Sequence, residues 1–211
     1  MNVDATRFTA PALLIVDMQN DFVRAGAPLE VPDARATFEA HRRLIAAFRR
    51  IGAPVIYTRF LATPEPSLLW RWSPQCAPPT SCCQKGFRRS YADHAGELEC
   101  TDIVGEIAPR EGDTLIDKYG YGAFHGTRLS DHLRQAGVRS LVVTGTVTQI
   151  CVEETAREAF HHGFATTLAS DAVSSFAPDL HAATLKNFAM KFGWVEDSAA
   201  IIAALERAPG N

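Results

Sequence analysis

The feature that most constrains the fold is the alternation of short apolar runs with longer amphipathic stretches. Strands are expected at residues 12–17, 54–59, 114–118, 138–145 and 164–170, with a short sixth at 194–195. Helices are expected at residues 35–51, 128–136, 150–162 and 178–192, and after a cap at Asp197 or Ser198. This alternation predicts an α/β fold, a doubly wound (Rossmann-like) parallel sheet of five to six strands with helices on both faces.

One stretch, residues 61–112, interrupts the alternation because it shows no clean period. It is rich in proline and contains Trp70 and Trp72. An insertion of this length without regular structure is usually functional. We therefore interpret residues 61–112 as an irregular lid or oligomer-contact excursion within one domain that spans residues 1–211.

Composition and charge exclude several classes of function. The 211 residues include 21 basic and 24 acidic side chains, so the net charge of −3 gives no field suited to nucleic acid. The longest apolar runs, such as 141–147, are far shorter than the roughly 20 residues that span a bilayer. The first ten residues lack the apolar core of a signal peptide. We expect a cytoplasmic protein with no nucleic-acid partner and no membrane partner.

The cysteine pattern gives no sign of a structural metal. The five cysteines are Cys76, Cys82, Cys83, Cys100 and Cys151. They form no C-x2-C pair, and no nearby H-x3-H pair completes a zinc set. Without a secretory signal, reduced thiols are expected. The sequence thus predicts neither a metal nor another cofactor.

Three reactive side chains, Asp17, Lys118 and Cys151, fall at or just beyond the carboxyl ends of expected strands, where ligands bind in parallel sheets. Each has a simpler interpretation: a turn cap, a solvated lysine and a small buried apolar residue. Together they supply the base, cation and nucleophile of cysteine-dependent acyl transfer. A thiol at a helix N-terminus is expected to favour the thiolate. Backbone N–H groups between Gly145 and Cys151 are candidate oxyanion donors.

Three blocks of the sequence resemble the isochorismatase-like cysteine hydrolases. They are LLIVDMQNDF (13–22), DKYGYGAFHGTRL (117–129) and VVTGTVTQICVEETAREAFHHGF (142–164). This superfamily includes nicotinamidases, N-carbamoylsarcosine amidases, ureidoacrylate and maleamate amidases and biuret hydrolases. The resemblance implies an Asp17–Lys118–Cys151 triad, the same doubly wound fold, a cis peptide bond at Thr146–Val147 and symmetric homo-oligomers.

The sequence departs from the family pattern at three places. Gln149 stands where Asn or Asp is common, so the polar contact there is altered. The stretch Arg59–Ala62 lacks the Asp-x-His metal motif of nicotinamidases, which argues against a nicotinamidase and against a catalytic metal. The segment CAPPTSCC (76–83) matches no family pattern.

We therefore predict a linear amide amidohydrolase that cleaves a C–N bond of a small amide, carbamoyl or ureido substrate through a thioester. Backbone N–H groups of Val147 and Cys151 would hold the oxyanion. One alternative is a catalytically silent binding or assembly module on the same fold. Another is an enol-ether hydrolase of the isochorismatase type, which dispenses with a thiol, so that Cys151 argues against it.

Several side chains near the triad motifs are candidates for contact with the substrate. They are Phe22, Tyr119, Tyr121, Phe124, Gln149, Trp70 and Trp72. The aromatic residues could equally be core, because aromatic side chains dominate buried surface. Arg88 and Arg89 could bind a substrate carboxylate or could be solvated. Because the aromatic residues of 61–112 would leave apolar surface exposed on a monomer, a homodimer or homotetramer is expected.

Overall fold

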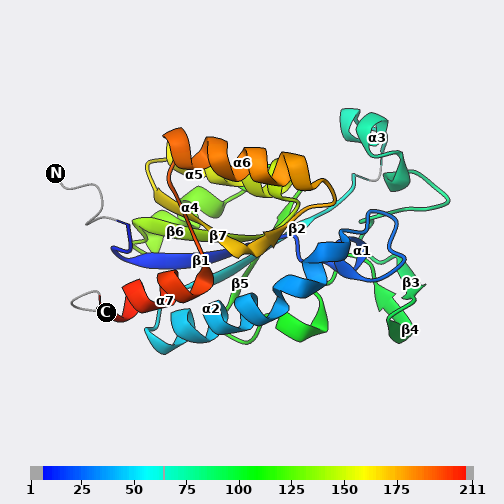
Figure 1. Cartoon of the computed structure of the whole chain (residues 1–211). Helices are drawn as coiled ribbons and strands as arrows, with labels where there is room; N and C mark the ends of the chain where they lie inside the picture. The colour runs from blue at the N-terminus through cyan, green and yellow to red at the C-terminus, as the bar shows by residue number, and fades with distance from the viewer. Residues whose placement is uncertain (1–6, 64, 208–211) are drawn as a thin grey trace.

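A six-stranded parallel sheet runs through the centre of the computed structural model, which describes residues 7–63 and 65–207 (Figure 1). The strand order is β5-β2-β1-β6-β7-β8. These strands are β1 (Pro11–Val16), β2 (Val55–Phe60), β5 (Thr114–Lys118), β6 (Ser140–Thr146), β7 (Ala165–Ser174) and β8 (Trp194–Glu196). The doubly wound α/β fold is therefore confirmed, including the short sixth strand.

The chain builds this sheet outward from its middle in both directions. After β1 it adds β2 and β5 on one side, and it then returns to add β6, β7 and β8 on the other. Because β1 and β6 are neighbours, the direction of winding switches between them. Ligands of open α/β sheets bind in the crevice at such a switch point, beyond the carboxyl ends of the strands.

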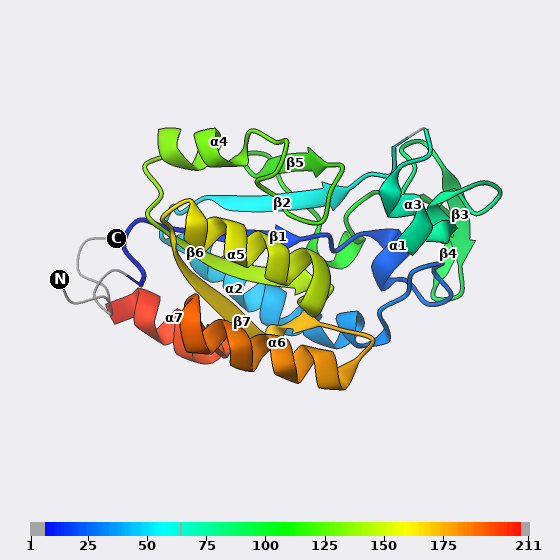
Figure 2. The same cartoon turned by 90° about the horizontal axis from the view of Figure 1, so that it is seen from above.

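Helices cover both faces of the sheet (Figures 1 and 2). On one face lie α2 (Phe38–Arg50) and α7 (Ser198–Arg207), and on the other lie α4 (Leu129–Gln135), α5 (Glu153–His161) and α6 (Pro178–Lys191). The side chains of β1 alternate between these layers: Leu13 and Ile15 join one core cluster, and Leu14 and Val16 join the other. This explains why β1 is a continuous apolar run. Among the described residues, no helix has the length and apolarity needed to cross a membrane.

Two helices begin differently from the sequence-based expectation. A 3-10 turn at Pro32–Thr37 precedes α2, and a π-helical turn at Thr148–Val152 precedes α5. The π-turn contains Cys151, which therefore lies ahead of the α-helix and not in its first turn. Single π-helical turns are rare and are frequently found at functional sites.

Residues 61–112 contain short regular elements that the periodicity did not reveal. These elements lie at one end of the sheet and are α3 (Leu68–Trp72) and an antiparallel hairpin of β3 (Arg88–Tyr91) and β4 (His94–Glu99). None of the residues of α3 is buried, and β4 is exposed along most of its length. Because these elements bury little surface, their sequences need no regular spacing of apolar residues. In Figure 2 the segment lies beyond the carboxyl ends of the strands, beside α1 (Asn20–Val23).

Candidate active site

The carboxylate of Asp17 occupies the switch point, directly after β1. Asp17 is fully buried and has a positive φ of 51°. Its Oδ1 accepts a hydrogen bond of 2.7 Å from the hydroxyl of Thr58 on β2. Its Oδ2 lies 2.7 Å from Nζ of Lys118, the last residue of β5. Three adjacent strands therefore place a base and a cation in direct contact.

Lys118 is a buried ammonium whose N–H groups are fully occupied. Besides pairing with Asp17, its Nζ donates hydrogen bonds of 2.9 Å to the carbonyl oxygens of Gly120 and Tyr121. Burial alone would lower the pKa of Lys118, but the charge of Asp17, with a further contribution from the neighbouring Cys151, outweighs burial and raises it. An ammonium has three donors, so these three acceptors satisfy it.

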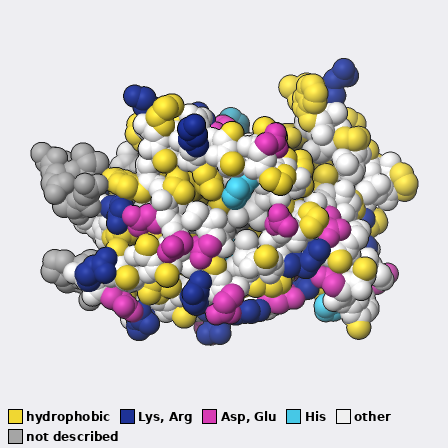
Figure 3. All heavy atoms as spheres, in the orientation of Figure 1, with side chains coloured by type: hydrophobic (Ala, Val, Ile, Leu, Met, Phe, Trp, Pro, Cys, Tyr) yellow, Lys and Arg dark blue, Asp and Glu magenta, His cyan; other side chains and the backbone are white. Residues whose placement is uncertain are grey.

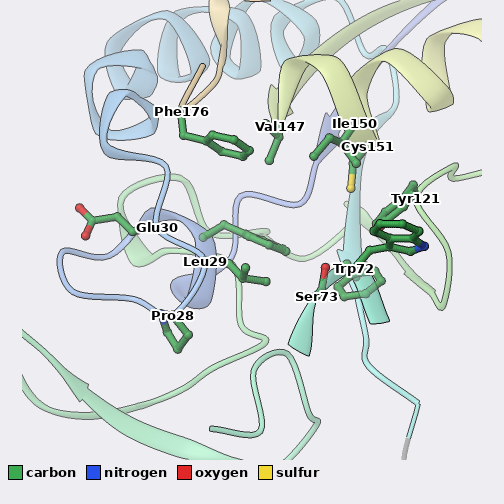
Figure 4. A pocket seen from close by; sticks show the side chains of 12 residues that line it. Pro28, Leu29, Glu30, Trp72, Ser73, Tyr121, Val147, Ile150, Cys151 and Phe176 are labelled. Atoms are coloured by element: carbon green, nitrogen blue, oxygen red, sulfur yellow. The ribbon is translucent and has the colours of Figure 1, made fainter. Parts of the chain in front are cut away.

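Cys151 supplies the third reactive group and opens into a cavity. The residue is 4% exposed, and Figure 4 shows its sulfur pointing into the space that Tyr121 and Trp72 border on one side. Burial raises the pKa of this thiol to about 12, although the charge of Lys118 acts in the opposite direction and that of Asp17 adds to the rise. Desolvation therefore acts against the thiolate that a position at a helix N-terminus led us to expect.

The backbone between β6 and Cys151 is held by close contacts on both sides. A Cβ atom on Gly145, whose φ is 110°, would lie 2.0 Å from the carbonyl oxygen of Val16. Only glycine can therefore pair with β1 at this position. The next peptide bond but one, Thr146–Val147, is cis, as the resemblance implied. Thr148 Oγ1 then donates a hydrogen bond of 2.9 Å to the carbonyl oxygen of Ser174, which ties the π-turn to β7.

The sulfur of Cys151 faces a cavity of about 550 Å³. Strand ends, the π-turn, the loop after α1 and the start of residues 61–112 all contribute to its walls (Figure 4). Its lining residues are mostly apolar: Phe22, Pro28, Leu29, Glu30, Phe60, Trp72, Ser73, Tyr121, Val147, Ile150, Cys151 and Phe176. A volume of this size is typical of sites for small molecules.

Of the seven predicted substrate contacts, the structure places Phe22, Tyr121 and Trp72 at this cavity.

The other four predicted contacts do not line the cavity, so the prediction that they touch the substrate is corrected. Tyr119 is 56% exposed, and Phe124 is buried against the rings of His162 and Phe164. Trp70 packs against the main core, and Gln149 accepts a hydrogen bond of 2.7 Å from Ser175. Proximity in sequence to a catalytic motif did not reveal which way these side chains face.

Sequence reasoning missed the role of Gln19 and Asn20. The side chain of Gln19 forms two hydrogen bonds with the backbone of Phe60, accepting from its N–H at 2.6 Å and donating to its carbonyl at 3.0 Å. Asn20 Nδ2 donates to the carbonyl of Glu99 at 2.8 Å. Both side chains are buried. The sequence did contain a signal for this role: several polar residues follow an apolar strand directly, which indicates a turn held by side-chain hydrogen bonds.

Asp21 connects the same turn to residues 61–112. Its carboxylate accepts hydrogen bonds from the hydroxyl of Tyr91 at 2.7 Å and the backbone N–H of Cys83 at 2.8 Å, and it pairs with Arg89 at 2.9 Å. The sulfurs of Cys82 and Cys83 lie within 4.8 Å of this carboxylate, which is close enough for a shared metal ion. Because the carboxylate already has three donors, a structural role in docking the insertion explains its burial.

Comparison with known proteins agrees with this geometry. A model of the Isochorismatase domain matches residues 11–200. The chain is 33% identical to ureidoacrylate amidohydrolase RutB of Methylobacterium radiotolerans, over 94% of this chain and 82% of that protein. It is 31% identical to nicotinamidase 3 of Arabidopsis thaliana, over 88% and 84%. The crystal structure of a cysteine hydrolase from Pseudomonas syringae pv. phaseolicola superposes with a TM-score of 0.83 at 25% identity, covering 97% of this chain and 94% of that one.

Proposed function

Because this chain belongs to the isochorismatase family and is a hydrolase of non-peptide C–N bonds, we propose that it cleaves a small amide, carbamoyl or ureido substrate through a thioester on Cys151. One observation carries the proposal. A thiol, a carboxylate and an ammonium from three separate parts of the chain converge beside one apolar cavity. The names of the relatives support this range of substrates.

The first half of the reaction begins with a neutral thiol. Asp17 accepts the proton of Cys151 as the sulfur attacks the substrate carbonyl, so the thiolate exists only in the presence of substrate. The carbonyl oxygen becomes an oxyanion, to which the backbone N–H groups of Val147 and Cys151 donate. Lys118 acts through its charge, because its donors are already used by Asp17 and two carbonyl groups.

The second half returns the enzyme to its starting state. The protonated Asp17 gives its proton to the leaving nitrogen as the C–N bond breaks, which leaves an acyl group on the sulfur of Cys151. Asp17 then accepts a proton from water as the water attacks the thioester. The thioester bond breaks, the sulfur regains a proton, and the acid is released. The aromatic rings of Phe22, Tyr121 and Trp72 form the walls around the acyl group.

Replacement of the nucleophile tests this function. Cys151→Ser is expected to keep the fold and to lose release of ammonia from primary amides. Cys100→Ser is the matched control, because this buried thiol donates to the carbonyl of Gln84 and a serine hydroxyl can replace that bond. Release at the wild-type rate by Cys151→Ser, with Cys100→Ser also active, would contradict the proposed nucleophile.

We also propose that the chain acts as a homodimer or homotetramer. Leu68 and Trp72 on α3 are 82% and 76% exposed, and Met190 on α6 is 66% exposed. Figure 3 shows hydrophobic side chains gathered at the tip of α3, at the upper right. Large exposed apolar side chains of this kind often mark contacts between subunits. Light scattering combined with size exclusion tests the assembly, and an active species of 23.0 kDa would contradict it.

A further inference from the structure

The cavity beside Cys151 carries almost no charge, which restricts the amides that can enter it. Among its lining residues, within the part of the chain that the structure describes, Glu30 alone bears a full charge, and none is a lysine or an arginine. The other lining side chains that carry a polar group are those of Ser73, Tyr121 and Cys151. Recognition in this cavity therefore depends mainly on apolar contact.

The charge of Glu30 is already neutralised within the protein. Its carboxylate accepts a hydrogen bond of 2.8 Å from the backbone N–H of Gly26 and another of 2.8 Å from the guanidinium of Arg35. The bond from Gly26, followed by that from Arg35, lowers the pKa of Glu30. In Figure 4 this carboxylate points away from the centre of the cavity. Glu30 is consequently not available to a cationic substrate, and as a carboxylate it offers no partner to an anionic one.

The buried cation at the floor of the site is equally unavailable to a substrate carboxylate. Nζ of Lys118 has one carboxylate and two carbonyl oxygens within 2.9 Å, which account for all three of its donors. To bind a second carboxylate, Lys118 would have to release Asp17, the base on which the reaction depends. The Asp17–Lys118 ion pair therefore takes part in the reaction but does not bind a charged group of the substrate.

The two arginines that the sequence suggested for carboxylate binding have other partners. Arg89 pairs with the buried Asp21 and donates a hydrogen bond of 2.7 Å to the carbonyl of Thr80. Arg88 donates to the carbonyl of Glu97 within the exposed hairpin. Neither lines the cavity. These contacts dock and order residues 61–112, so the insertion adds Trp72 to the substrate cavity without adding a cation.

We propose, on the basis of the amidohydrolase function above, that the substrate is an uncharged amide with an apolar or aromatic acyl group. Carboxylate-bearing ureides and carbamoyl amino acids are excluded. A carboxylate placed among these side chains would lose its hydration without gaining a counter-ion, which is strongly unfavourable. A cavity of about 550 Å³ has room for an aromatic ring and its linker beside the sulfur of Cys151.

A matched pair of substrates tests this selectivity. The two amides are 3-phenylpropanamide and its para-carboxylate derivative, which differ only in the distal charge, and ureidoacrylate serves as a second anion. We expect kcat/KM for the neutral amide to exceed that for each anion by at least about 100-fold, because an unpaired carboxylate must be buried. Equal or faster turnover of either anion would overturn the inference and leave the amidohydrolase function intact.

A charge introduced into the wall gives a second test. Leu29→Lys places a cation among the lining residues, and Leu29→Met is the control of similar length. The lysine variant should reduce the preference for the neutral amide at least tenfold, because the carboxylate gains a partner, while the methionine variant keeps it. An unchanged preference in both variants would contradict recognition by this cavity.

Binding separates the inference from the proposed function. Calorimetric titration of the Cys151→Ser variant with the two amides measures selectivity without turnover. Tighter binding of the neutral amide, combined with no hydrolysis of any amide by the wild-type enzyme, would refute the amidohydrolase function and uphold the selectivity of the cavity. Tighter binding of the carboxylate derivative would refute the selectivity. Arg71→Ala, which changes an exposed arginine on α3 outside the lining, should leave both affinities unaltered.

Discussion

The carboxyl edge of the sheet and the insertion at residues 61–112 meet at the same cavity but are stabilised in different ways. At the sheet edge, the pairing of β2 with β5 reaches Lys118 itself, and the backbone N–H of Asp17, directly after β1, donates to the carbonyl of Thr58 on β2. The insertion has a short exposed helix and a two-stranded hairpin, and a buried carboxylate, Asp21, connects it to the turn after β1. The sheet therefore positions the reactive groups, and the insertion contributes a wall whose docking depends on a few polar contacts.

The same substitution should have its largest effect at the sheet edge and a small effect in the insertion. Gly145→Ala would place a Cβ atom 2.0 Å from the carbonyl oxygen of Val16. We therefore expect the free energy of unfolding to fall by more than about 4 kcal/mol. Gly96→Ala lies in the hairpin, where φ is also positive but no atom is within 4 Å, and should cost about 1–2 kcal/mol. Urea denaturation measures both. Equal losses would remove the contrast between the regions.

Removal of a lysine should show the same contrast at a slightly smaller scale. Lys118→Met leaves Asp17 buried without its counter-ion and should lower the free energy of unfolding by about 3–5 kcal/mol. Lys85→Met removes an insertion lysine that is 65% exposed and 3.5 Å from Asp117, and should change it by less than about 1 kcal/mol. A loss below about 1 kcal/mol for Lys118→Met would show that the buried pair is not what stabilises the edge.

The sheet edge could be predicted from the sequence and the docking of the insertion could not, because the first depends on local patterns and the second on contacts between residues far apart in the sequence. The expected strand at 12–17 corresponds to β1 at Pro11–Val16, because a strand buried on both faces has a local apolar signature. The convergence of Asp17, Lys118 and Cys151 followed from parallel topology. The docking of the insertion could not be predicted in this way, since Asp21 and its partners Arg89 and Tyr91 are about 70 residues apart.

Two site predictions failed for a related physical reason. Tyr119 and Phe124 follow Lys118 closely, yet one is exposed and the other is buried in the core beneath the loop. The direction of a side chain in a loop depends on contacts from other elements, here α5 for the loop after Lys118. At Cys151 burial opposes the expected thiolate, and burial depends on how many elements surround the sulfur, which a local motif does not show.

A substitution that weakens only the docking of the insertion should have an intermediate effect on the free energy of unfolding. Asp21→Asn weakens the acceptor for Arg89 and should cost about 1–3 kcal/mol, with faster amide hydrogen exchange in residues 81–104 than in β1 and β6. Glu97→Gln makes the same chemical change on the exposed β4 and should leave exchange unaltered. Uniformly faster exchange across the sheet would show that the two regions unfold as one unit.

The smallest expected effect concerns a residue that shapes the cavity without stabilising the fold. Trp72 is 76% exposed, so Trp72→Ala should change the free energy of unfolding by less than about 0.5 kcal/mol. It lines the cavity, and KM should rise about 2–10-fold as one aromatic contact is lost. Leu68→Ala on the same helix is 82% exposed and outside the cavity, and should leave KM unchanged. Equal KM values for the two variants would mean that α3 takes no part in substrate binding.

We expect the sheet edge, and not the thiol-rich insertion, to perform the chemistry, and the position of the acyl group in the trapped enzyme decides between the two. The enzyme is mixed with 3-phenylpropanamide, quenched in acid during turnover, and analysed by intact mass and peptide mapping of its five thiols. We expect a single acyl group, carried by Cys151 and absent from Cys151→Ser. An acyl group on Cys76, Cys82, Cys83 or Cys100 during productive turnover would contradict it.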